Sequence, residues 1–212
     1  MEREYKTIAA YAQDEFIEKK SRFIGSILPC KTELEALDFI EQKRKQYWDA
    51  THNVYAYIIR QPGTPTPIKR SSDDGEPQGT AGHPVLDVLE KEGLTDLCVV
   101  ATRYFGGVML GAGGLVRAYS HTSKIAVDAA EILNMSICKL YQLEFDYHLY
   151  GKISYILPNY QTRIESSDFG ESVKMKISIR YDRTERFLKE LTELTNGQVI
   201  PIEILEQYEN MK

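Results

Sequence analysis

The sequence has few cysteines, no long hydrophobic run and no histidine spacing typical of a metal site, and each absence excludes a class of protein. Cys30, Cys98 and Cys138 are the three cysteines among 212 residues. Their odd number and wide spacing predict reduced thiols rather than a disulfide framework or a zinc site. No apolar run approaches the length of a membrane span, and residues 1–6 lack the apolar stretch of a signal peptide. We therefore expect a cytoplasmic protein with no membrane partner.

The composition is that of an ordinary globular protein, with 42% hydrophobic and 27% charged residues. The length suits one large domain or two small ones. The formal net charge of −5 argues against a protein that coats nucleic acid through bulk charge, because such binding needs a large cationic surface. A local basic patch remains compatible with this charge.

The first part of the chain reads as a mixture of strands and helices. Apolar and aromatic runs predict strands at residues 5–10, 22–30, 54–59 and 97–101. Thr32, followed three residues later by Glu35, forms a capping box and predicts a helix to about Gln46. Leu34, Leu37, Phe39 and Ile40 are its expected inner residues. Pro84 suits the first turn of a short helix that ends near Glu92.

Two further features of this part bear on function. Residues 61–84 are dense in Pro, Gly, Ser and Asp and predict a long loop, which in a compact domain is usually functional or disordered. A glycine-rich turn at residues 106–114 precedes a predicted helix over residues 115–133. The expected inner stripe of that helix is Leu115, Ala118, Thr122, Ile125, Ala129 and Ile132, spaced three and four apart.

After Asn134 the pattern changes to strand, helix, strand, strand, helix, strand. The predicted elements cover residues 141–147, 149–157, 162–167, 173–180, 183–195 and 199–205. This order is typical of a split βαββαβ, or ferredoxin-like, domain. The sequence therefore predicts an α+β protein with two domains, residues 1–135 and 138–212.

Three carboxylates fall within four residues of the long loop, at Asp73, Asp74 and Glu76. Such a cluster can hold a hard divalent cation or take part in acid–base chemistry. The alternative is that the carboxylates accept backbone N–H groups and shape a turn, which is the ordinary role of aspartate in loops. The sequence alone leaves both interpretations open.

Five of the nine residues in the glycine turn are glycine, namely Gly106, Gly107, Gly111, Gly113 and Gly114. A helix that begins after such a turn has free N–H groups and is a natural binding site for an anion. The spacing matches neither a Walker A loop nor a dinucleotide fingerprint. Tight packing between a strand and a helix is the equally weighted alternative.

Cationic residues accompany the glycines. Arg117, His121 and Lys124 are spaced four and three apart, so they share one helical face. Arg103 and Tyr104 end the preceding strand. An arginine and an aromatic ring beside a helix start suit phosphate binding with stacking, as at nucleic-acid sites. The alternative is a solvated helix surface, and no nucleophile–base pair is evident, so we predict no catalytic residue.

The motifs at residues 20–24, 72–77, 79–84, 103–107 and 110–119 resemble those of the YigZ/IMPACT family. The resemblance covers residues 1–134 densely and residues 138–212 with weaker motifs. It implies a ribosomal protein S-five domain 2-like N-terminal domain and a ferredoxin-like C-terminal domain, both similar to elongation-factor domains. For a bacterial member it implies binding to nucleic acid or the ribosome. We expect a protein that engages RNA, the ribosome or a translation factor and modulates translation.

The sequence therefore supports two candidate functions from different classes. The first is a non-enzymatic binding protein without a cofactor, whose anion-binding residues lie around the glycine turn. The second is a metal-assisted hydrolase or phosphoryl-transfer enzyme, in which Asp73, Asp74 and Glu76 hold a divalent cation. The second interpretation fails if these carboxylates already cap backbone groups.

Overall fold

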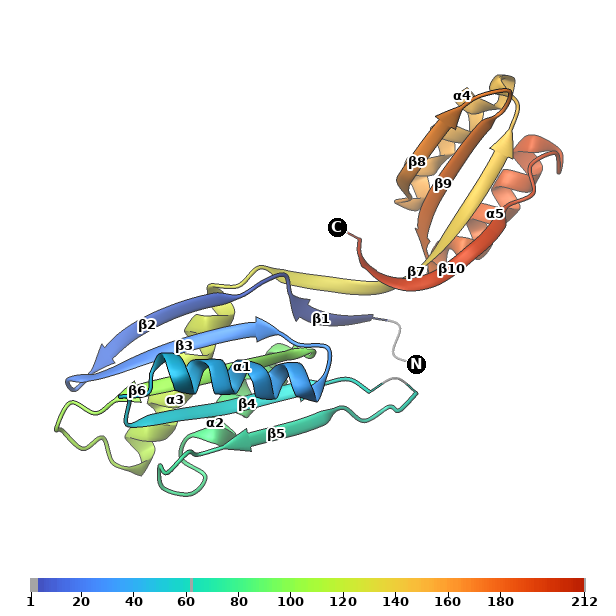
Figure 1. Ribbon diagram of the computed structural model, residues 1–212. Helices are drawn as coiled ribbons and strands as arrows, with labels where there is room; N and C mark the ends of the chain where they lie inside the picture. The colour runs from blue at the N-terminus through green and yellow to red at the C-terminus, as the bar shows by residue number, and fades with distance from the viewer. Residues whose placement is uncertain (1–3, 62, 212) are drawn as a thin grey trace. The chain divides into compact units, whose positions relative to one another are not determined.

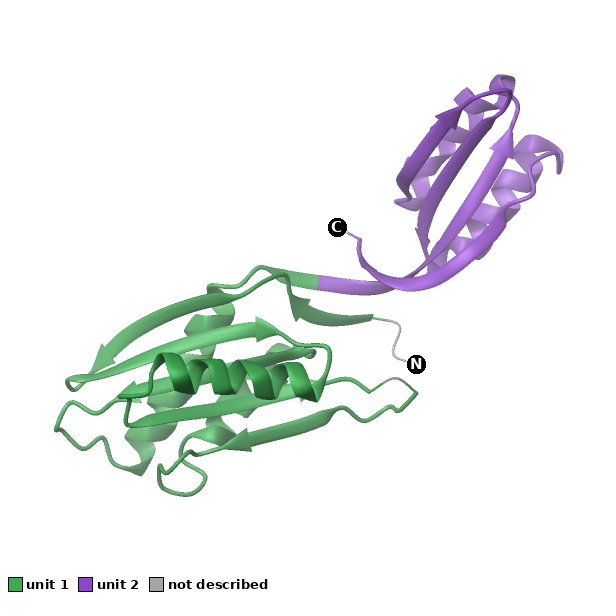
Figure 2. Ribbon diagram, in the orientation of Figure 1, with its two compact units in different colours: residues 1–133 green, residues 134–212 purple. Residues whose placement is uncertain are grey.

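The computed structural model describes residues 4–61 and 63–211. The chain forms two compact units, Met1–Leu133 (unit 1) and Asn134–Lys212 (unit 2), which are coloured separately in Figure 2. Each unit has its own hydrophobic core. Both contain helices and an antiparallel sheet, so the protein is of the α+β class.

Unit 1 is built on an antiparallel sheet in which every neighbouring pair of the path β2-β3-β6-β4-β5 is antiparallel. Its strands are β2 (Ala12–Glu18), β3 (Ser21–Pro29), β4 (His52–Ile59), β5 (Ile68–Ser72) and β6 (Leu97–Tyr104). The short β1 (Glu4–Ile8) precedes them, and its Lys6 forms an isolated bridge with Leu94.

Helices cover both faces of this sheet (Figure 1). Helices α2 (Gly82–Glu92) and α3 (Ala112–Asp128) pack on one face, where Val99 and Ala101 join their core. Helix α1 (Glu33–Gln46) packs on the other face, over Cys98 and Val100. Because β6 is buried on both faces, it reads as the continuous apolar run seen in the sequence.

Helix α1 begins as predicted but turns a different side to the core. The Thr32 hydroxyl accepts the N–H of Glu35 at 3.2 Å, which is the N-cap contact expected from the sequence. Leu34 and Leu37, however, are 68% and 47% exposed. The buried stripe contains Ala36, Phe39, Ile40 and Lys43. The expected inner stripe was therefore wrong at both leucines.

Several element boundaries also differ from the prediction. Strand β2 was not predicted, because it lies at the sheet edge and most of its residues are exposed and polar. The predicted loop over residues 61–84 contains β5, and its residue 62 lies outside the described residues. Helix α3 begins three residues earlier than predicted, at Ala112, and ends at Asp128. Residues 132–133, which were predicted to belong to this helix, are the first residues of β7 (Ile132–Phe145).

Unit 2 has the predicted order of elements. After β7 come α4 (Tyr147–Ile156), a 3-10 turn (Leu157–Tyr160), β8 (Arg163–Phe169), β9 (Val173–Arg180), α5 (Tyr181–Thr195) and β10 (Ile202–Asn210). β10 pairs with β7, β7 with β9 and β9 with β8, all antiparallel. Both helices pack on one face of this sheet (Figure 1), where Leu143, Ile153, Met175 and Phe187 are fully buried. No helix in the described parts of the chain is long and apolar enough to cross a membrane.

Contact between β3 and α3 depends on Gly25, and a substitution there tests the fold of unit 1. A Cβ at residue 25 would lie 2.3 Å from the carbonyl oxygen of Thr122 in α3. We expect Gly25→Ala to lower the free energy of unfolding by about 1–3 kcal/mol, the usual cost of overpacking. Urea unfolding followed by far-UV circular dichroism measures this change.

Gly113→Ala is the matched control, because Gly113 lies in α3 and its added Cβ would meet nothing within 4 Å. Replacing a helical glycine in this way stabilises a helix by roughly 0.5–1 kcal/mol. Equal shifts of the unfolding midpoint in both variants would contradict the close approach of β3 to α3.

Candidate functional site

Four connections meet at one end of the unit 1 sheet (Figure 1). The register explains why, since Arg22 at the start of β3 and His52 at the start of β4 pair with Tyr104 and Arg103 at the end of β6. The connections are residues 19–20 between β2 and β3, 47–51 between α1 and β4, 73–81 between β5 and α2, and 105–111 between β6 and α3. The acidic loop and the glycine turn are therefore brought to the same end of one sheet.

The turn between β2 and β3 brings two lysines to this end. Lys19 and Lys20 have φ values of +45° and +67°, which is the pattern of a type I′ turn and is unusual for residues other than glycine or asparagine. The glycine turn lies against them, because a Cβ at Gly106 would be 2.0 Å from the Lys20 carbonyl oxygen. The Gly106 N–H donates to Ser21 Oγ at 3.2 Å. Gly106 is thus required by close backbone contact.

Two of the three clustered carboxylates shape the acidic loop. Asp73 accepts the backbone N–H groups of Gly79, Ala81 and Gly82 at 2.8, 3.0 and 2.8 Å. Burial acts to raise the pKa of Asp73, but these three hydrogen bonds outweigh it and hold the pKa below its usual value. Asp73 is therefore an anionic cap for the start of α2.

Asp74 is also occupied by protein groups. Its carboxylate accepts the backbone N–H of Asn53 at 2.7 Å and pairs with Arg44 at 2.9 Å. Its carbonyl oxygen lies 2.8 Å from His52 Nδ1. Asp74 therefore joins the acidic loop to the start of β4 and to α1.

Glu76 and Arg103 form a buried ion pair, with 2.6 Å between Glu76 Oε1 and Arg103 Nη1 and side chains 4% and 5% exposed. The hydroxyl of Tyr119 in α3 donates to the same carboxylate oxygen at 2.7 Å. Burial and the neighbouring Glu76 carboxylate raise the pKa of Tyr119. His52 Nε2 lies 3.8 Å from that oxygen.

These contacts correct two expectations from the sequence. Arg103 is not an exposed ligand for an anion, because its guanidinium is buried and forms an ion pair with Glu76. Asp73, Asp74 and Glu76 do not converge, and their oxygens already bind N–H, guanidinium and hydroxyl groups. Among the described residues no group of His, Cys, Asp and Glu side chains is placed to hold a metal ion. The hydrolase interpretation therefore loses the cluster on which it rested.

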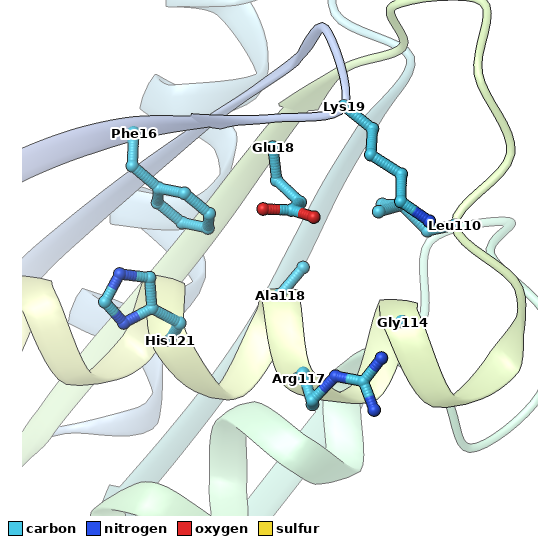
Figure 3. Close-up of a pocket in the computed structure, with 8 residues that line it drawn as sticks. All are labelled: Phe16, Glu18, Lys19, Leu110, Gly114, Arg117, Ala118 and His121. Atoms are coloured by element: carbon cyan, nitrogen blue, oxygen red, sulfur yellow. The ribbon is translucent and has the colours of Figure 1, made fainter.

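A pocket of about 280 Å³ opens between α3 and the β2–β3 hairpin (Figure 3). Its lining residues are Phe16, Glu18, Lys19, Leu110, Gly114, Arg117, Ala118 and His121. Arg117 and Lys19 face it from opposite sides (Figure 3), and within the described chain neither side chain has a hydrogen bond or an ion pair. The Glu18 carboxylate also projects into the pocket, so it contains charges of both signs.

The other predicted cations and rings at this end have partners. Lys124 pairs with Glu92 at 3.1 Å and with Asp128 at 2.5 Å, so it adds no free charge beside Arg117. The Tyr104 hydroxyl donates to Asp49 at 2.8 Å. Burial, together with that hydrogen bond, raises the pKa of Tyr104 to about 12. The ring of His121 meets that of Phe16 edge-on, with 4.6 Å between centroids.

Helix α3 begins at the end of the glycine turn without a side-chain cap. Gly111 is the N-cap residue and has a φ of +73°, a conformation that favours glycine. Gly107 and Gly113 border open space, whereas a Cβ at Gly114 would come within 3.0 Å of Leu110. The first N–H groups of α3 thus lie beside the pocket with no competing side-chain acceptor.

The part of the pocket that β2 and its turn supply was not predicted from the sequence. Phe16, Glu18 and Lys19 come from β2 and its turn, which were not predicted as a strand and a turn. The available signal was weak: two apolar pairs, Phe16-Ile17 and Phe23-Ile24, are separated by five polar residues that contain the turn, and lysines are uncommon residues for such a turn. His52 and Tyr119 were missed because only the fold brings them to Glu76.

The buried Glu76–Arg103 pair can be tested against an exposed pair of equal length. Glu76→Gln leaves the Arg103 charge buried without a counter-charge, so we expect the free energy of unfolding to fall by about 3–5 kcal/mol. The control is Glu15→Gln. Glu15 pairs with Arg22 at the same 2.6 Å, but those side chains are 47% and 49% exposed. Its expected cost is below about 1 kcal/mol, and similar losses in the two variants would refute the role of burial.

Comparison with known proteins agrees with this architecture. The family model of the Impact N-terminal domain matches residues 19–127, and that of a domain of unknown function, DUF1949, matches residues 143–198. The IMPACT family member YvyE of Bacillus subtilis (strain 168) is 39% identical over 194 residues, which are 92% of this chain and 88% of that protein.

Two further relatives extend the comparison. The IMPACT family member YigZ of Escherichia coli (strain K12) is 32% identical over 187 residues, covering 87% of this chain and 91% of that protein. A crystal structure of a hypothetical protein matches with a TM-score of 0.61 and 29% identity, over 98% of this chain and 100% of that one. The chain therefore belongs to the IMPACT family, as a YigZ-like bacterial member with an Impact N-terminal domain followed by a DUF1949 domain.

Proposed function

We propose that this protein is a non-enzymatic binding protein that engages RNA, free or within the ribosome, and thereby modulates translation. The observation that carries the proposal is the pocket beside the start of α3, which Lys19 lines from the β2–β3 turn and Arg117 from α3. Phosphate groups are the ligands that such cations and free helix N–H groups recognise together.

The contrast between paired and unpaired cations at this end of the sheet supports Lys19 and Arg117 as the phosphate-binding residues. Arg103 and Lys124 are neutralised by carboxylates of the same chain, whereas no such partner meets Lys19 or Arg117 in the part of the chain that the structure describes. A cation without an internal partner on a rigid element is available to a phosphate. The net charge of −5 then restricts binding to this local surface.

The Glu18 carboxylate allows the pocket to bind a base as well as a phosphate. A carboxylate repels phosphate but accepts hydrogen bonds from the donor groups of bases, such as cytosine N4 and the N3–H of uracil. We propose that the phosphate lies on the side of Arg117 and Lys19, with a base edge toward Glu18. The mixture of charges therefore fits a nucleotide unit better than it fits an isolated anion.

The proposal extends to the architecture of the chain. We propose that units 1 and 2 are separate domains, the first S-five domain 2-like and the second ferredoxin-like. The order β10-β7-β9-β8, with a helix after β7 and another after β9, supports the second assignment. Unit 1 contains the residues on which RNA binding depends.

RNA binding is tested by removing the two free cations of the pocket. We expect Lys19→Ala combined with Arg117→Ala to weaken binding of a labelled 15-nucleotide oligouridylate, measured by fluorescence anisotropy over a series of salt concentrations. Each lost phosphate contact lowers the slope of log Kobs against log salt by about 0.7 for a single strand, so the slope should fall by about 1.4.

Lys31→Ala combined with Lys91→Ala is the control, because it removes the same charge. Both lysines are exposed, and they lie near Pro29 and Leu94, toward the other end of β3 and β6. We expect this variant to keep the slope of the unmodified protein. Loss of affinity in both variants by the same factor, or no binding at low salt by the unmodified protein, would refute the proposal.

A further inference from the structure

We propose that the RNA bound at this end of unit 1 is single-stranded, and that the indole of Trp48 stacks on one of its bases. This inference rests on the proposed function and deepens it, because it names the form of RNA and a second point of contact. It rests on the exposure of Trp48, on hydrogen bonds that join its connection to the residues before the glycine turn, and on the two cations of the pocket beyond that turn.

Trp48 lies in the connection between α1 and β4 and is 82% exposed. Over the described chain its side chain makes neither a hydrogen bond nor a contact with another ring. Covering a ring of this size with a ligand would stabilise the complex, because apolar surface is removed from water. A ligand that covers the ring accounts for its position.

The connection that carries Trp48 is fixed by three hydrogen bonds to the end of β6 and to Phe105, the residue before the glycine turn. The N–H of Thr51 donates to the carbonyl oxygen of Arg103 at 2.9 Å. The N–H of Phe105 donates to Thr51 Oγ1 at 3.0 Å, and the Tyr104 hydroxyl donates to Asp49 at 2.8 Å. Trp48 is therefore anchored beside the segment that leads into the pocket.

A second ring stands in that segment. Phe105 is 46% exposed, and the guanidinium carbon of Arg103 lies 5.3 Å from its ring centroid and 5.4 Å from that of Phe23. The buried arginine thus supports one side of the Phe105 ring. Two exposed rings, Trp48 and Phe105, therefore belong to connections at this end of the sheet.

Single-stranded RNA is the ligand that matches both the rings and the charges. Its bases are unstacked and can cover aromatic side chains, whereas a duplex hides the faces of its bases. Its phosphates match the Lys19 and Arg117 charges. An apolar peptide would cover the rings but would leave these cations unused, so we favour a nucleic acid.

Trp48 is the single tryptophan of the chain, so fluorescence excited at wavelengths that tyrosine does not absorb reports on this side chain alone. We expect 12-nucleotide oligouridylate to quench the fluorescence, and an abasic ribose-phosphate oligomer of equal length and charge to leave it unchanged. Trp48→Ala should weaken oligouridylate binding roughly 5- to 100-fold, the usual effect of losing one stacked base. Trp48→Phe should restore part of the affinity.

Tyr155→Ala is the control, because Tyr155 is an aromatic residue of unit 2 with 80% exposure. We expect it to bind oligouridylate as the unmodified protein does. Saturated binding by anisotropy without quenching, or equal affinity in Trp48→Ala, would overturn this inference and leave the proposed function intact. Equal quenching by the abasic oligomer would also overturn it. Absence of RNA binding altogether would refute the proposed function itself.

Discussion

The buried Glu76–Arg103 ion pair is the interaction on which the shape of the site depends. A guanidinium that is 5% exposed cannot remain in the interior without a counter-charge. This need for a counter-charge holds Glu76, and with it the acidic loop, at the end of β6. Because Tyr119 donates to the same carboxylate, α3 is fixed to the same point. Arg103, Glu76 and Tyr119 therefore join strand, loop and helix, and the glycine turn between β6 and α3 is held from both ends.

Internal pairing of charges separates the residues that hold the fold from those that face a ligand. Asp73 caps backbone groups, Asp74 joins β4 and α1, and Lys124 is neutralised by two carboxylates. Lys19 and Arg117 lie at the same end of the sheet and face an open pocket. We therefore propose that the ligand binds at the pocket, while the acidic loop holds the elements around it in place.

The order of elements in unit 2 and the helix that carries Arg117 could be predicted from the sequence, but the partners of the individual charges could not. The spacing of Arg117, His121 and Lys124 correctly places them on one helix, yet nothing local reveals that Glu92 from α2 reaches Lys124. Arg103 ends a strand and looks exposed in the sequence, because its partner Glu76 lies far along the chain. Likewise, a polar edge strand such as β2 lacks the apolar alternation that predicts a strand. Which charges are paired, and which edge segments form strands, depends on contacts between segments that are distant in the sequence.

Photo-crosslinking tests the central claim, RNA binding at this end of unit 1, most directly. The protein would be irradiated in complex with 4-thiouridine-labelled single-stranded RNA, and the crosslinked peptides would be identified by mass spectrometry. Our account predicts crosslinks within residues 16–24, 47–52 and 104–121, with their yield falling as salt rises. Crosslinks confined to unit 2, or to the start of α1 around Lys31, would contradict it.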